Sequence, residues 1–593
     1  MKLIHYLSLY IDSFKRFSSS QLFYWILNKY IKKLVPTNFY IGRLDQNELI
    51  PFDTIRSRLI NSLVLNRPLS LNNANCDTDF KLIHHYFNDV DEIFISLDRN
   101  KSEFENFWKI IEDQTDLEIQ NNYQRFYFFA ETIEVNNFNP EFGLKLIDEW
   151  IDRFPPSKDI SWNTFNCTIR LINWFKILGK LPKEYKINRN LWNKIHISIY
   201  KQINYISSHI EYHIPGNHII IQLYVLWLVS VVFPAWNKTI KKISEAEKLF
   251  KKELQNEFLT NGFHFEHSYH YHVQVTLFGM LWLIGMKNLN NFVEENVLKI
   301  LTSTSLLLEE FINPNGYLPM LGDNCFCFLT RNLYEDIELF KILKPMALTG
   351  VFPKVKSSKV LDIKGSYVLA RSFESEIIFD VSNIGLPNNP GHGHSDLLSI
   401  IYSFKGHPIF VDPGTKKYSS DQASFVMKKA ISHNTISIGR NDQAKLWGFF
   451  RWGYLPENLS YNIEESEMAI NLSGKYYGFK HIGGYEHSRK IVMGKDNLQI
   501  EDHINGKKNN MVELNFVLHP SVSALVNDGL ILIVHNDFEL KFNIQSDFKY
   551  TVNIESFDMF PSYDVLIPTQ KIRVVFENIT FPFFSKVIIS YLS

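Results

Sequence analysis

Residues 347–360 read ALTGVFPKVKSSKV, and this stretch separates two different sequence patterns. Before it, apolar residues recur every three or four positions, which is typical of amphipathic helices. After it, short apolar runs alternate with turn-forming residues, which is typical of β-strands. Gly350, Pro353 and a cluster of Lys and Ser residues interrupt both patterns. We therefore expect a domain boundary here, with helices before it and strands after it.

The helical pattern extends from the N-terminus to about residue 343. Segments such as 150–154 and 171–178 place apolar residues on one helical face. Pro215 and Gly216 close one helix, and Asn217 is the predicted N-cap of the next. We find no repeat of fixed residues, which disfavours a regular tetratricopeptide-like solenoid. The pattern predicts stacked helical hairpins, in either a solenoid or a closed α/α toroid.

The strand pattern begins at about residue 366 and continues almost to the C-terminus. Turn formers such as 494–497 and 527–529 separate the runs, and no helical pattern intervenes. This favours an antiparallel β-sandwich, with a ligand cleft where it joins the helical domain. The predicted strands are 366–370, 376–381, 398–404, 435–438, 490–493, 498–501, 512–518 and 530–534.

Composition limits the classes of function. The 593 residues are enough for two to four domains. The formal net charge is −1, with 62 basic and 63 acidic residues, so a dedicated nucleic-acid-binding protein is not expected. Aromatic residues make up 15% of the chain; most are expected to fill cores, although rings in a cleft commonly stack on sugars.

The cysteines do not predict a disulfide framework. Four are present, and the closest pair, Cys325 and Cys327, has a spacing that is awkward for a disulfide. Cys76 and Cys167 are isolated in the sequence.

Neither a signal peptide nor a membrane span is expected. The first 17 residues are broken by polar side chains and lack a small-residue cleavage site. The sequence therefore does not determine the cellular location of the protein. The default expectation is cytoplasmic, and the alternative is periplasmic. The most apolar window, 219–235, contains Gln222, so a buried helix is favoured over a transmembrane one.

Gly216-Asn217-His218 places an amide and an imidazole at the mouth of this apolar helix. Free backbone N–H groups and the helix dipole suit the N-terminus of a helix to an anionic ligand group. The alternative is that Asn217 only caps the helix.

Residues 261–272, NGFHFEHSYHYH, combine four histidines, two tyrosines and a glutamate. On a helix, Ser268 and Tyr271 would share a face, and neighbouring groups would orient the phenol. A tyrosine can act as both base and acid when its surroundings lower its pKa. We interpret His264 and His270 as solvated or structural.

Residues 390–396, PGHGHSD, bring together two histidines separated by one glycine. With Asp412 and His433, His394 forms a set of the ligand types that zinc accepts, although spacing alone cannot demonstrate the site. A plain structural role for the two histidines is the alternative. In the turn-rich segment 316–323, Asp323 could either shape the cleft or belong to a connecting loop.

These motifs, in this order, resemble the heparinase II/III-like polysaccharide lyases, a group that includes oligoalginate lyases. Trp162, Arg170 and Asn173-Trp174 resemble the pattern of the family's helical domain. The resemblance covers most of the chain beyond about residue 80. The motifs that carry it are Gly216-Asn217-His218, Glu266-x-Ser268-x-x-Tyr271-His272, Gly391–Asp396, Val411–Thr415 with Tyr418, and Ser432–Thr435.

The resemblance implies a fold and a domain division. The fold is an α/α toroid followed by an antiparallel β-sandwich. We expect a helical extension at 1–75, the toroid at 76–350 and the β-sandwich at 360–593. The implied activity is cleavage of an acidic, uronic-acid-containing polysaccharide by β-elimination.

The resemblance also implies roles for single residues. Asn217, His218, Tyr271 and His392 would be catalytic, the first two by binding the uronate carboxylate. Glu266, Asp323 and Tyr418 would contact the substrate. His394, Asp412 and His433 would hold a divalent ion, with structural Zn²⁺ as the preferred identity.

The sequence departs from the family at one position. Where some members carry a glutamate three residues after the helix-mouth histidine, this chain has Ile221, so a preference for sulfated glycosaminoglycans is not expected. The N-terminal segment around 21–25 is similar to members associated with the assembly of bacterial surface polysaccharide. Two rival functions are a non-catalytic carbohydrate-binding or assembly protein, and a glycoside hydrolase whose paired carboxylates would be Glu266 and Asp323.

Overall fold

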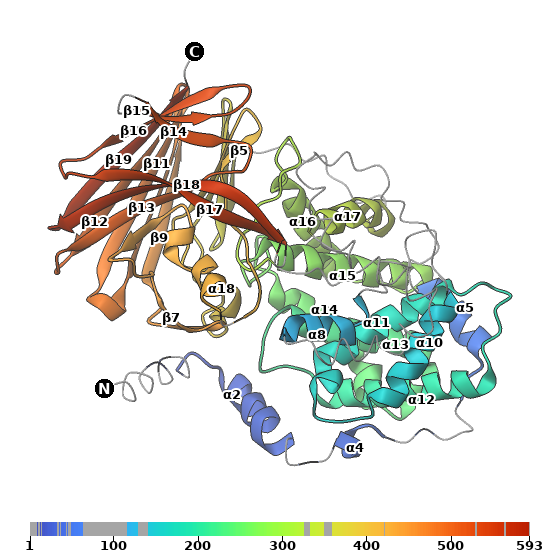
Figure 1. Cartoon of the computed structure of the whole chain (residues 1–593). Helices are drawn as coiled ribbons and strands as arrows, with labels where there is room; N and C mark the ends of the chain where they lie inside the picture. The colour runs from blue at the N-terminus through green and yellow to red at the C-terminus, as the bar shows by residue number, and fades with distance from the viewer. Residues whose placement is uncertain are drawn as a thin grey trace.

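In the computed structural model the chain forms a set of helices followed by a set of strands (Figure 1). The last long helix, α17, ends at Ala347, and the first strand, β1, begins at Val360. This confirms the predicted change from helix to strand. The structure describes residues 140–324, 333–348, 359–419, 421–527, 530–562 and 565–591, with 116–127, 49–62 and parts of 9–44 before them.

The helical domain consists of helices that pack against their neighbours in sequence. α11 packs against α12 and α13, α13 against α14 and α15, and α15 against α16 and α17. These stacked hairpins agree with the predicted toroid fold. The helices are α2 (Ser19–Ile26), α4 (Thr37–Tyr40), α5 (Phe52–Ser62), α8 (Leu117–Gln124), α10 (Pro140–Arg153), α11 (Thr164–Lys180), α12 (Arg189–Ser208), α13 (Asn217–Val232), α14 (Lys241–Glu257), α15 (Tyr269–Asn288), α16 (Glu295–Glu310) and α17 (Leu333–Ala347).

The pattern of apolar residues explains where each helix lies. α14 buries Ile243, Phe250 and Leu254 on one face and exposes charged residues on the other. α13 is apolar on all sides and is buried among its neighbours, as expected for the 219–235 window. No helix in the described part of the chain is long and apolar enough to cross a membrane.

The strands form three main antiparallel sheets and one short pair. The five-stranded sheet contains β1 (Val360–Ile363), β2 (Tyr367–Ser372), β3 (Ser375–Asp380), β4 (Ile400–Phe404) and β5 (His407–Phe410). The eight-stranded sheet contains β9 (Glu457–Glu465), β10 (Ala469–Gly478), β11 (Tyr485–Gly494), β12 (Asn497–Gly506), β14 (Ser523–Asn527), β15 (Leu530–Val534), β16 (Glu539–Gln545) and β19 (Phe583–Tyr591). The four-stranded sheet contains β6 (Ile436–Ile438), β13 (Asn510–Val517), β17 (Thr551–Ser562) and β18 (Val565–Ile579), and β7 (Lys445–Gly448) pairs with β8 (Arg451–Gly453).

One hydrophobic core joins the three main sheets, as expected for a sandwich. Along β11 and β12, side chains alternate between buried and more exposed positions, with Ile491 and Ile500 pointing inward. Phe379 of the five-stranded sheet and Phe516 of the four-stranded sheet belong to the same core. The predicted β-sandwich is therefore confirmed.

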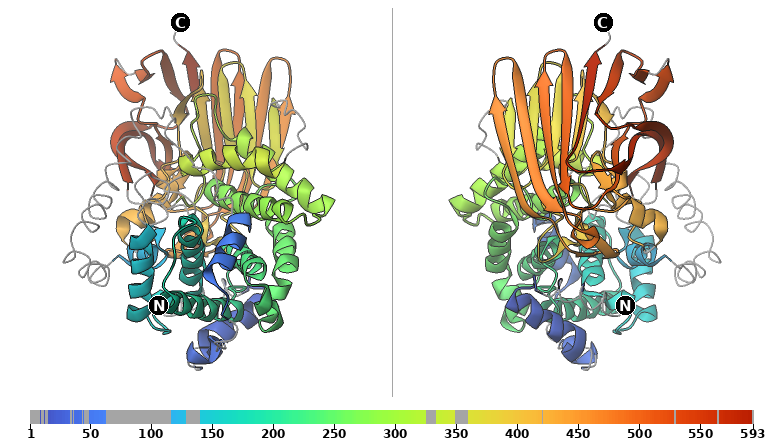
Figure 2. Two further views of the ribbon diagram at one scale, coloured as in Figure 1. Left: turned by 90° about the vertical axis from the view of Figure 1, so that its right-hand side faces the viewer. Right: turned by 90° about the vertical axis from the view of Figure 1, so that its left-hand side faces the viewer.

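The helices and the sheets lie at opposite ends of the molecule and meet along a joint (Figure 2). Across this joint, the Tyr367 hydroxyl donates a hydrogen bond to the carbonyl oxygen of His267. Arg371 of β2 pairs with Glu310 of α16 at 2.7 Å. These contacts fix the helical domain against the five-stranded sheet.

Described parts of the N-terminal segment contact both domains. Arg16 donates to the carbonyl oxygen of Trp452 in β8 at 2.7 Å, and Asn28 lies 2.8 Å from His213 before α13. The predicted extension at 1–75 and the toroid boundary at 76 stay predictions, because residues 63–115 lie outside the described residues. The same holds for Cys76, Cys325 and Cys327, whereas Cys167 is a buried free thiol.

Candidate active site

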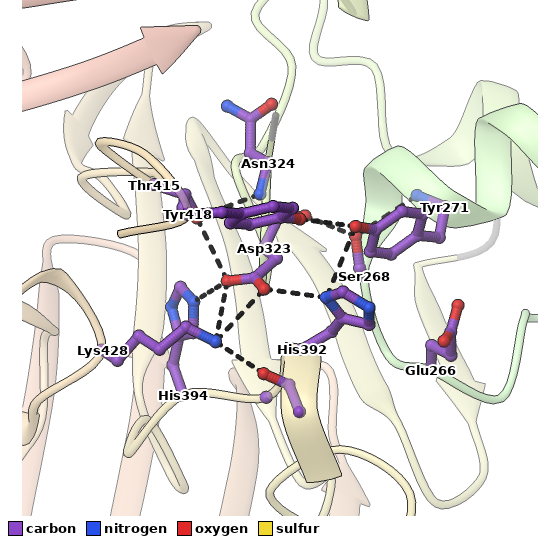
Figure 3. Close-up of polar contacts among 12 residues, drawn as sticks. Glu266, Ser268, Tyr271, Asp323, Asn324, His392, His394, Thr415, Tyr418 and Lys428 are labelled. Atoms are coloured by element: carbon purple, nitrogen blue, oxygen red, sulfur yellow. Dashed lines mark hydrogen bonds and ion pairs between the residues drawn. The ribbon is translucent and has the colours of Figure 1, made fainter. Parts of the chain in front are cut away.

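The candidate active site lies where α15 meets the loops of the β domain (Figure 3). Tyr271 comes from the first turn of α15. His392 ends a short 3-10 helix at Pro390–His392, and Tyr418 precedes the short helix α18 (Gln422–Met427). The three side chains, predicted from sequence as site residues, are brought together from two domains.

Tyr271 is held by hydrogen bonds at its backbone N–H and by contacts at its hydroxyl. Ser268 caps α15 by accepting a hydrogen bond from the Tyr271 N–H at 3.2 Å, and its hydroxyl donates to the carbonyl oxygen of Asp323 at 2.8 Å. The Tyr271 hydroxyl lies 2.5 Å from the Tyr418 hydroxyl and 3.4 Å from His392 Nδ1. Tyr271 is only 2% exposed, so its oxygen has a defined position.

Asp323 links the two histidines of residues 390–396. Its Oδ2 accepts a hydrogen bond from His392 Nδ1, and its Oδ1 accepts one from His394 Nε2, both at 2.8 Å. Because an ionised carboxylate only accepts hydrogen bonds, this geometry assigns the neutral His392 proton to Nδ1 and leaves Nε2 as the basic nitrogen.

A buried lysine keeps Asp323 ionised. Lys428 Nζ donates to Asp323 Oδ2 at 3.1 Å and to the carbonyl oxygen of Gly391 at 2.6 Å. Burial alone would raise the pKa of Asp323, but the Lys428 ammonium and the hydrogen bonds from both histidines hold it well below its usual value. Asp323 is fully buried, and its predicted contact with substrate stays a prediction.

The backbone at Gly393 lets two histidines at i and i+2 reach one carboxylate. The 3-10 helix ends at His392, and Gly393 is extended, so the two histidines do not lie on a regular strand. A Cβ on Gly393 would lie 2.3 Å from the backbone nitrogen of Gly385, a clash that favours glycine. His392 is partly exposed and His394 is not, and the predicted division into a cleft-facing and a metal-facing histidine stays a prediction.

Asn217 does not cap α13, contrary to the sequence prediction. The N-cap is Gly216, with a φ of 143° that favours glycine, and Asn217 is the first helical residue. A Cβ on residue 216 would lie 2.2 Å from Glu266 Oε1. This clash explains why the residue at the turn is glycine. Asn217 Nδ2 instead donates to Gln274 Oε1 of α15 at 3.3 Å.

His218 lies beside this helix mouth. Its ring stacks on Phe165 with a centroid distance of 3.8 Å, and its Nδ1 lies 3.0 Å from Glu211 Oε2. Stacking and the carboxylate hold the imidazole in one orientation.

Glu266 lies close to the helix mouth and to His392 (Figure 3). The N–H of Asn217 points to its Oε2 over 3.5 Å. Burial raises the pKa of Glu266, although nearby His392 and His218 oppose the rise. Asp323 is already paired with Lys428, so the two acids do not form the free carboxylate pair that a glycoside hydrolase needs.

Two of the four histidines in residues 261–272, His264 and His270, are buried and hydrogen-bonded. His264 is fully buried with its Nε2 3.1 Å from Glu257 Oε2, and His270 Nε2 accepts a hydrogen bond from Gln274 Nε2 at 2.7 Å. Burial lowers the pKa of His270 to about 3, so it is neutral at working pH. The solvated alternative for these two residues is wrong.

His394, Asp412 and His433 form a buried group in which one ligand atom of each lies within 4.8 Å of the others. His394 Nδ1 and His433 Nε2 are buried without a hydrogen-bond partner. Unpaired polar atoms of this kind are costly in a protein interior, and a cation would satisfy them. Two imidazoles and a carboxylate therefore fit a divalent metal ion.

Two sequence families match almost the whole chain. The family described as Heparinase II/III N-terminus matches residues 54–341, and the family described as Heparinase II/III-like, C-terminal matches residues 355–582. The chain belongs to the heparinase II/III-like family.

A curated heparinase relative shares part of the sequence. The heparin-sulfate lyase of Bacteroides thetaiotaomicron is 20% identical over 349 residues, which are 51% of this chain and 49% of that protein. The chain thus spans about half the length of the curated relative that it matches.

Solved heparinase structures share the fold. The crystal structure of heparinase III matches with a TM-score of 0.66 at 14% identity, covering 94% of this chain and 88% of that one. A heparan sulfate lyase HepC mutant from Pedobacter heparinus matches with a TM-score of 0.56 at 14% identity, covering 81% and 78%. At these identities the likeness establishes the heparinase fold and nothing further.

Sequence reasoning missed three residues of this heparinase-like site. Lys428 is followed by Lys429, and a pair of lysines normally indicates a solvated surface. Nothing in the sequence therefore predicted that Lys428 is buried. Gln274, which contacts Asn217, lies in a run that reads as plain helix core. Phe450 is 44% exposed, with its ring 5.6 Å from His392 and 5.1 Å from Tyr418, and is suited to stack on a sugar.

Proposed function

We propose that this protein is a polysaccharide lyase that cleaves a uronic-acid-containing glycan by β-elimination. The observation that supports this best is the Tyr271 hydroxyl, held between Tyr418 and His392 at the joint of the two domains. The Tyr418 hydroxyl can donate a hydrogen bond to the Tyr271 oxygen and so favour the phenolate form, which can take up a proton and return it.

In the proposed reaction, the Tyr271 phenolate takes the proton from C5 of the uronate. The electron pair of the C5–H bond moves through an enolate to form the C4–C5 double bond. The bond from C4 to the glycosidic oxygen breaks, and the phenol of Tyr271 returns the proton to that leaving oxygen. His392 would assist as base or stabilise charge, with its orientation set by Asp323.

The uronate carboxylate resists a second negative charge beside it, so the enolate needs polar support. We propose that Asn217 and His218 supply it, as the family resemblance implies. The N-terminus of α13 adds a favourable helix dipole. Phe450 and Tyr418 would contact the sugar rings.

We propose that the ion held by His394, Asp412 and His433 is Zn²⁺ with a structural role. Such an ion, when bound, would brace the loops that carry His394 and His433. His394 also contacts Asp323, so the ion would steady the partner of His392 without contacting substrate.

The proposed substrate class is a glycosaminoglycan-type polymer without obligatory sulfation. Ile221 is fully buried and cannot contact a ligand, and Lys428 is committed to Asp323. The related protein of Bacteroides thetaiotaomicron is named a heparin-sulfate lyase, which supports an acidic polysaccharide. A bacterial capsule or exopolysaccharide is the proposed source.

A panel of polymers tests the proposal. The purified protein is incubated with unsulfated and sulfated uronic-acid polymers, and ultraviolet absorbance of the 4,5-unsaturated end is followed. Product from an unsulfated polymer is expected. Binding to a polymer without any unsaturated product would contradict the lyase proposal and favour the non-catalytic carbohydrate-binding alternative.

A further inference from the structure

A second group of metal-ligand side chains lies on the surface of the β domain. His407 begins β5, at the hairpin turn that connects it to β4. His535 and Asp537 lie in the turn between β15 and β16. The two turns belong to the five-stranded and the eight-stranded sheet, so the group joins two sheets.

The three side chains converge on one carboxylate oxygen. His407 Nε2 lies 3.7 Å and His535 Nδ1 lies 3.5 Å from Asp537 Oδ2. One ligand atom of each residue lies within 4.8 Å of the others. These separations are too long for good hydrogen bonds. They are close to the spacing of about 3.3 Å between ligands that bond a tetrahedral zinc at about 2.0 Å.

The two imidazole rings of the group are packed against each other beside Asp537. The N–H of Asp537 donates to His535 Nδ1 at 3.2 Å, a hydrogen bond that a metal ion at this nitrogen would replace. The His407 and His535 rings lie 4.3 Å apart, and His535 stacks on Phe538 at 4.7 Å.

We propose that His407, His535 and Asp537 bind a divalent transition-metal ion, with zinc as the preferred ion. Two imidazoles and one carboxylate are ligands that zinc accepts, and water would complete the coordination. The ion would connect the β4–β5 turn to the β15–β16 turn. His407 and Asp537 are exposed to solvent, so this ion would exchange readily, unlike one held by the buried triad.

Zinc titration of the full-length chain tests the proposal. Protein is stripped with a chelator and titrated with zinc chloride by calorimetry, and bound zinc is counted by elemental analysis. His407→Ala and Asp537→Asn each remove one ligand. His503→Ala is the control, because this histidine lies exposed on β12 of the eight-stranded sheet, outside the group.

We expect wild type and His503→Ala to bind one more exchangeable zinc ion than His407→Ala, and Asp537→Asn to bind it about tenfold more weakly. Zinc should also raise the melting temperature of wild type more than that of His407→Ala. Equal zinc stoichiometry and affinity in wild type, His407→Ala and Asp537→Asn would overturn the proposal. Asp537 is 66% exposed, so loss of folding would not explain a change in that variant. The comparison does not depend on lyase activity.

Discussion

The hydroxyl of Tyr271, on the helical domain, lies 2.5 Å from the hydroxyl of Tyr418, on the β domain. Neither domain alone therefore contains the full set of groups around the Tyr271 phenol. The contacts that fix the joint, such as that of Arg371 with Glu310, also fix this distance. Any change that loosens the joint should lower turnover before it unfolds either domain.

Tyr271→Phe should abolish turnover while glycan binding is retained. The substitution removes the oxygen that carries the proton and keeps the ring, so the loss falls on kcat by about 10²–10⁴-fold or more. Product formation and binding affinity are measured on the same polymer.

Tyr269→Phe is the matched control for this variant. Its hydroxyl donates to the carbonyl oxygen of Leu308 in α16, away from the site. The control should lose about 1–2 kcal/mol of stability and keep its turnover. Unchanged kcat in Tyr271→Phe would remove this tyrosine from the mechanism.

Tyr418→Phe should shift the pH dependence of turnover. The Tyr418 hydroxyl can donate a hydrogen bond to the Tyr271 phenolate and so favour its ionised form. Without this donor the Tyr271 phenolate is less stabilised, so the rising limb of the kcat profile should move to higher pH. A lower kcat with an unshifted profile would instead mean that Tyr418 only binds substrate.

Asp323→Asn should destabilise the protein and lower turnover. It leaves the Lys428 ammonium buried without its carboxylate, which typically costs about 3–5 kcal/mol. It also removes the acceptor that orients His392, so kcat should fall even at temperatures where the variant is folded. Denaturant unfolding and initial rates provide the two measurements.

A double-mutant cycle separates the two effects of Asp323. Lys428→Met removes the buried charge, so Asp323→Asn with Lys428→Met should recover part of the lost stability but not the lost turnover. Strictly additive losses in stability would show that the two groups are not coupled.

His433→Ala should remove the ion of the buried triad. Elemental analysis of the protein as purified should find one bound ion fewer than in wild type, and a chelator should lower the melting temperature of wild type more than that of the variant. His503→Ala, far from the triad in sequence and exposed on β12, serves as the control. Equal metal content in His433→Ala and wild type would leave the triad as hydrogen-bonded structure.

Periodicity was sufficient to predict the fold at the level of domains. Side chains alternate between buried and exposed positions along strands such as β11, and apolar residues lie on one face of helices such as α14. Both patterns follow from the geometry of a strand or helix, so short stretches of sequence were enough to predict these elements. The start of α13 was predicted one residue late because Asn is a good N-cap. The Glu266 carboxylate lies against Gly216 and leaves no space for a Cβ at position 216. The two residues are 50 positions apart in sequence, so local sequence patterns could not predict this contact.

The site was harder to predict, because its energetics depend on partners that are distant in sequence. The motifs nominated Tyr271, His392 and Tyr418, which the fold brings into contact. Asp323 was predicted as a substrate contact, yet its environment is set by Lys428, which lies 105 positions away and has no distinguishing local pattern. Burial of a charged pair is a property of the folded structure alone.

Asp502→Asn should reduce the acid sensitivity of the β domain. Asp502 of β12 is buried and accepts hydrogen bonds from Arg489 at 2.8 and 3.0 Å and from His487 at 2.7 Å. Burial alone would raise its pKa, but the Arg489 guanidinium and His487 hold the pKa well below the usual value of 3.8. The folded state thus favours the ionised form, so this stabilisation is complete above the unfolded pKa and is lost as the pH falls below it.

At pH 7 the variant should be less stable than wild type by about 3–5 kcal/mol, because Arg489 stays buried without its carboxylate. Between roughly pH 4 and pH 2 wild type should lose stability steeply, so the difference between the two proteins narrows. Asp496→Asn, in the exposed turn before β12, is the control and should follow wild type at every pH. The measurement is the denaturant midpoint of each protein across this pH range. A constant difference in stability between Asp502→Asn and wild type would exclude Asp502 as the titrating group.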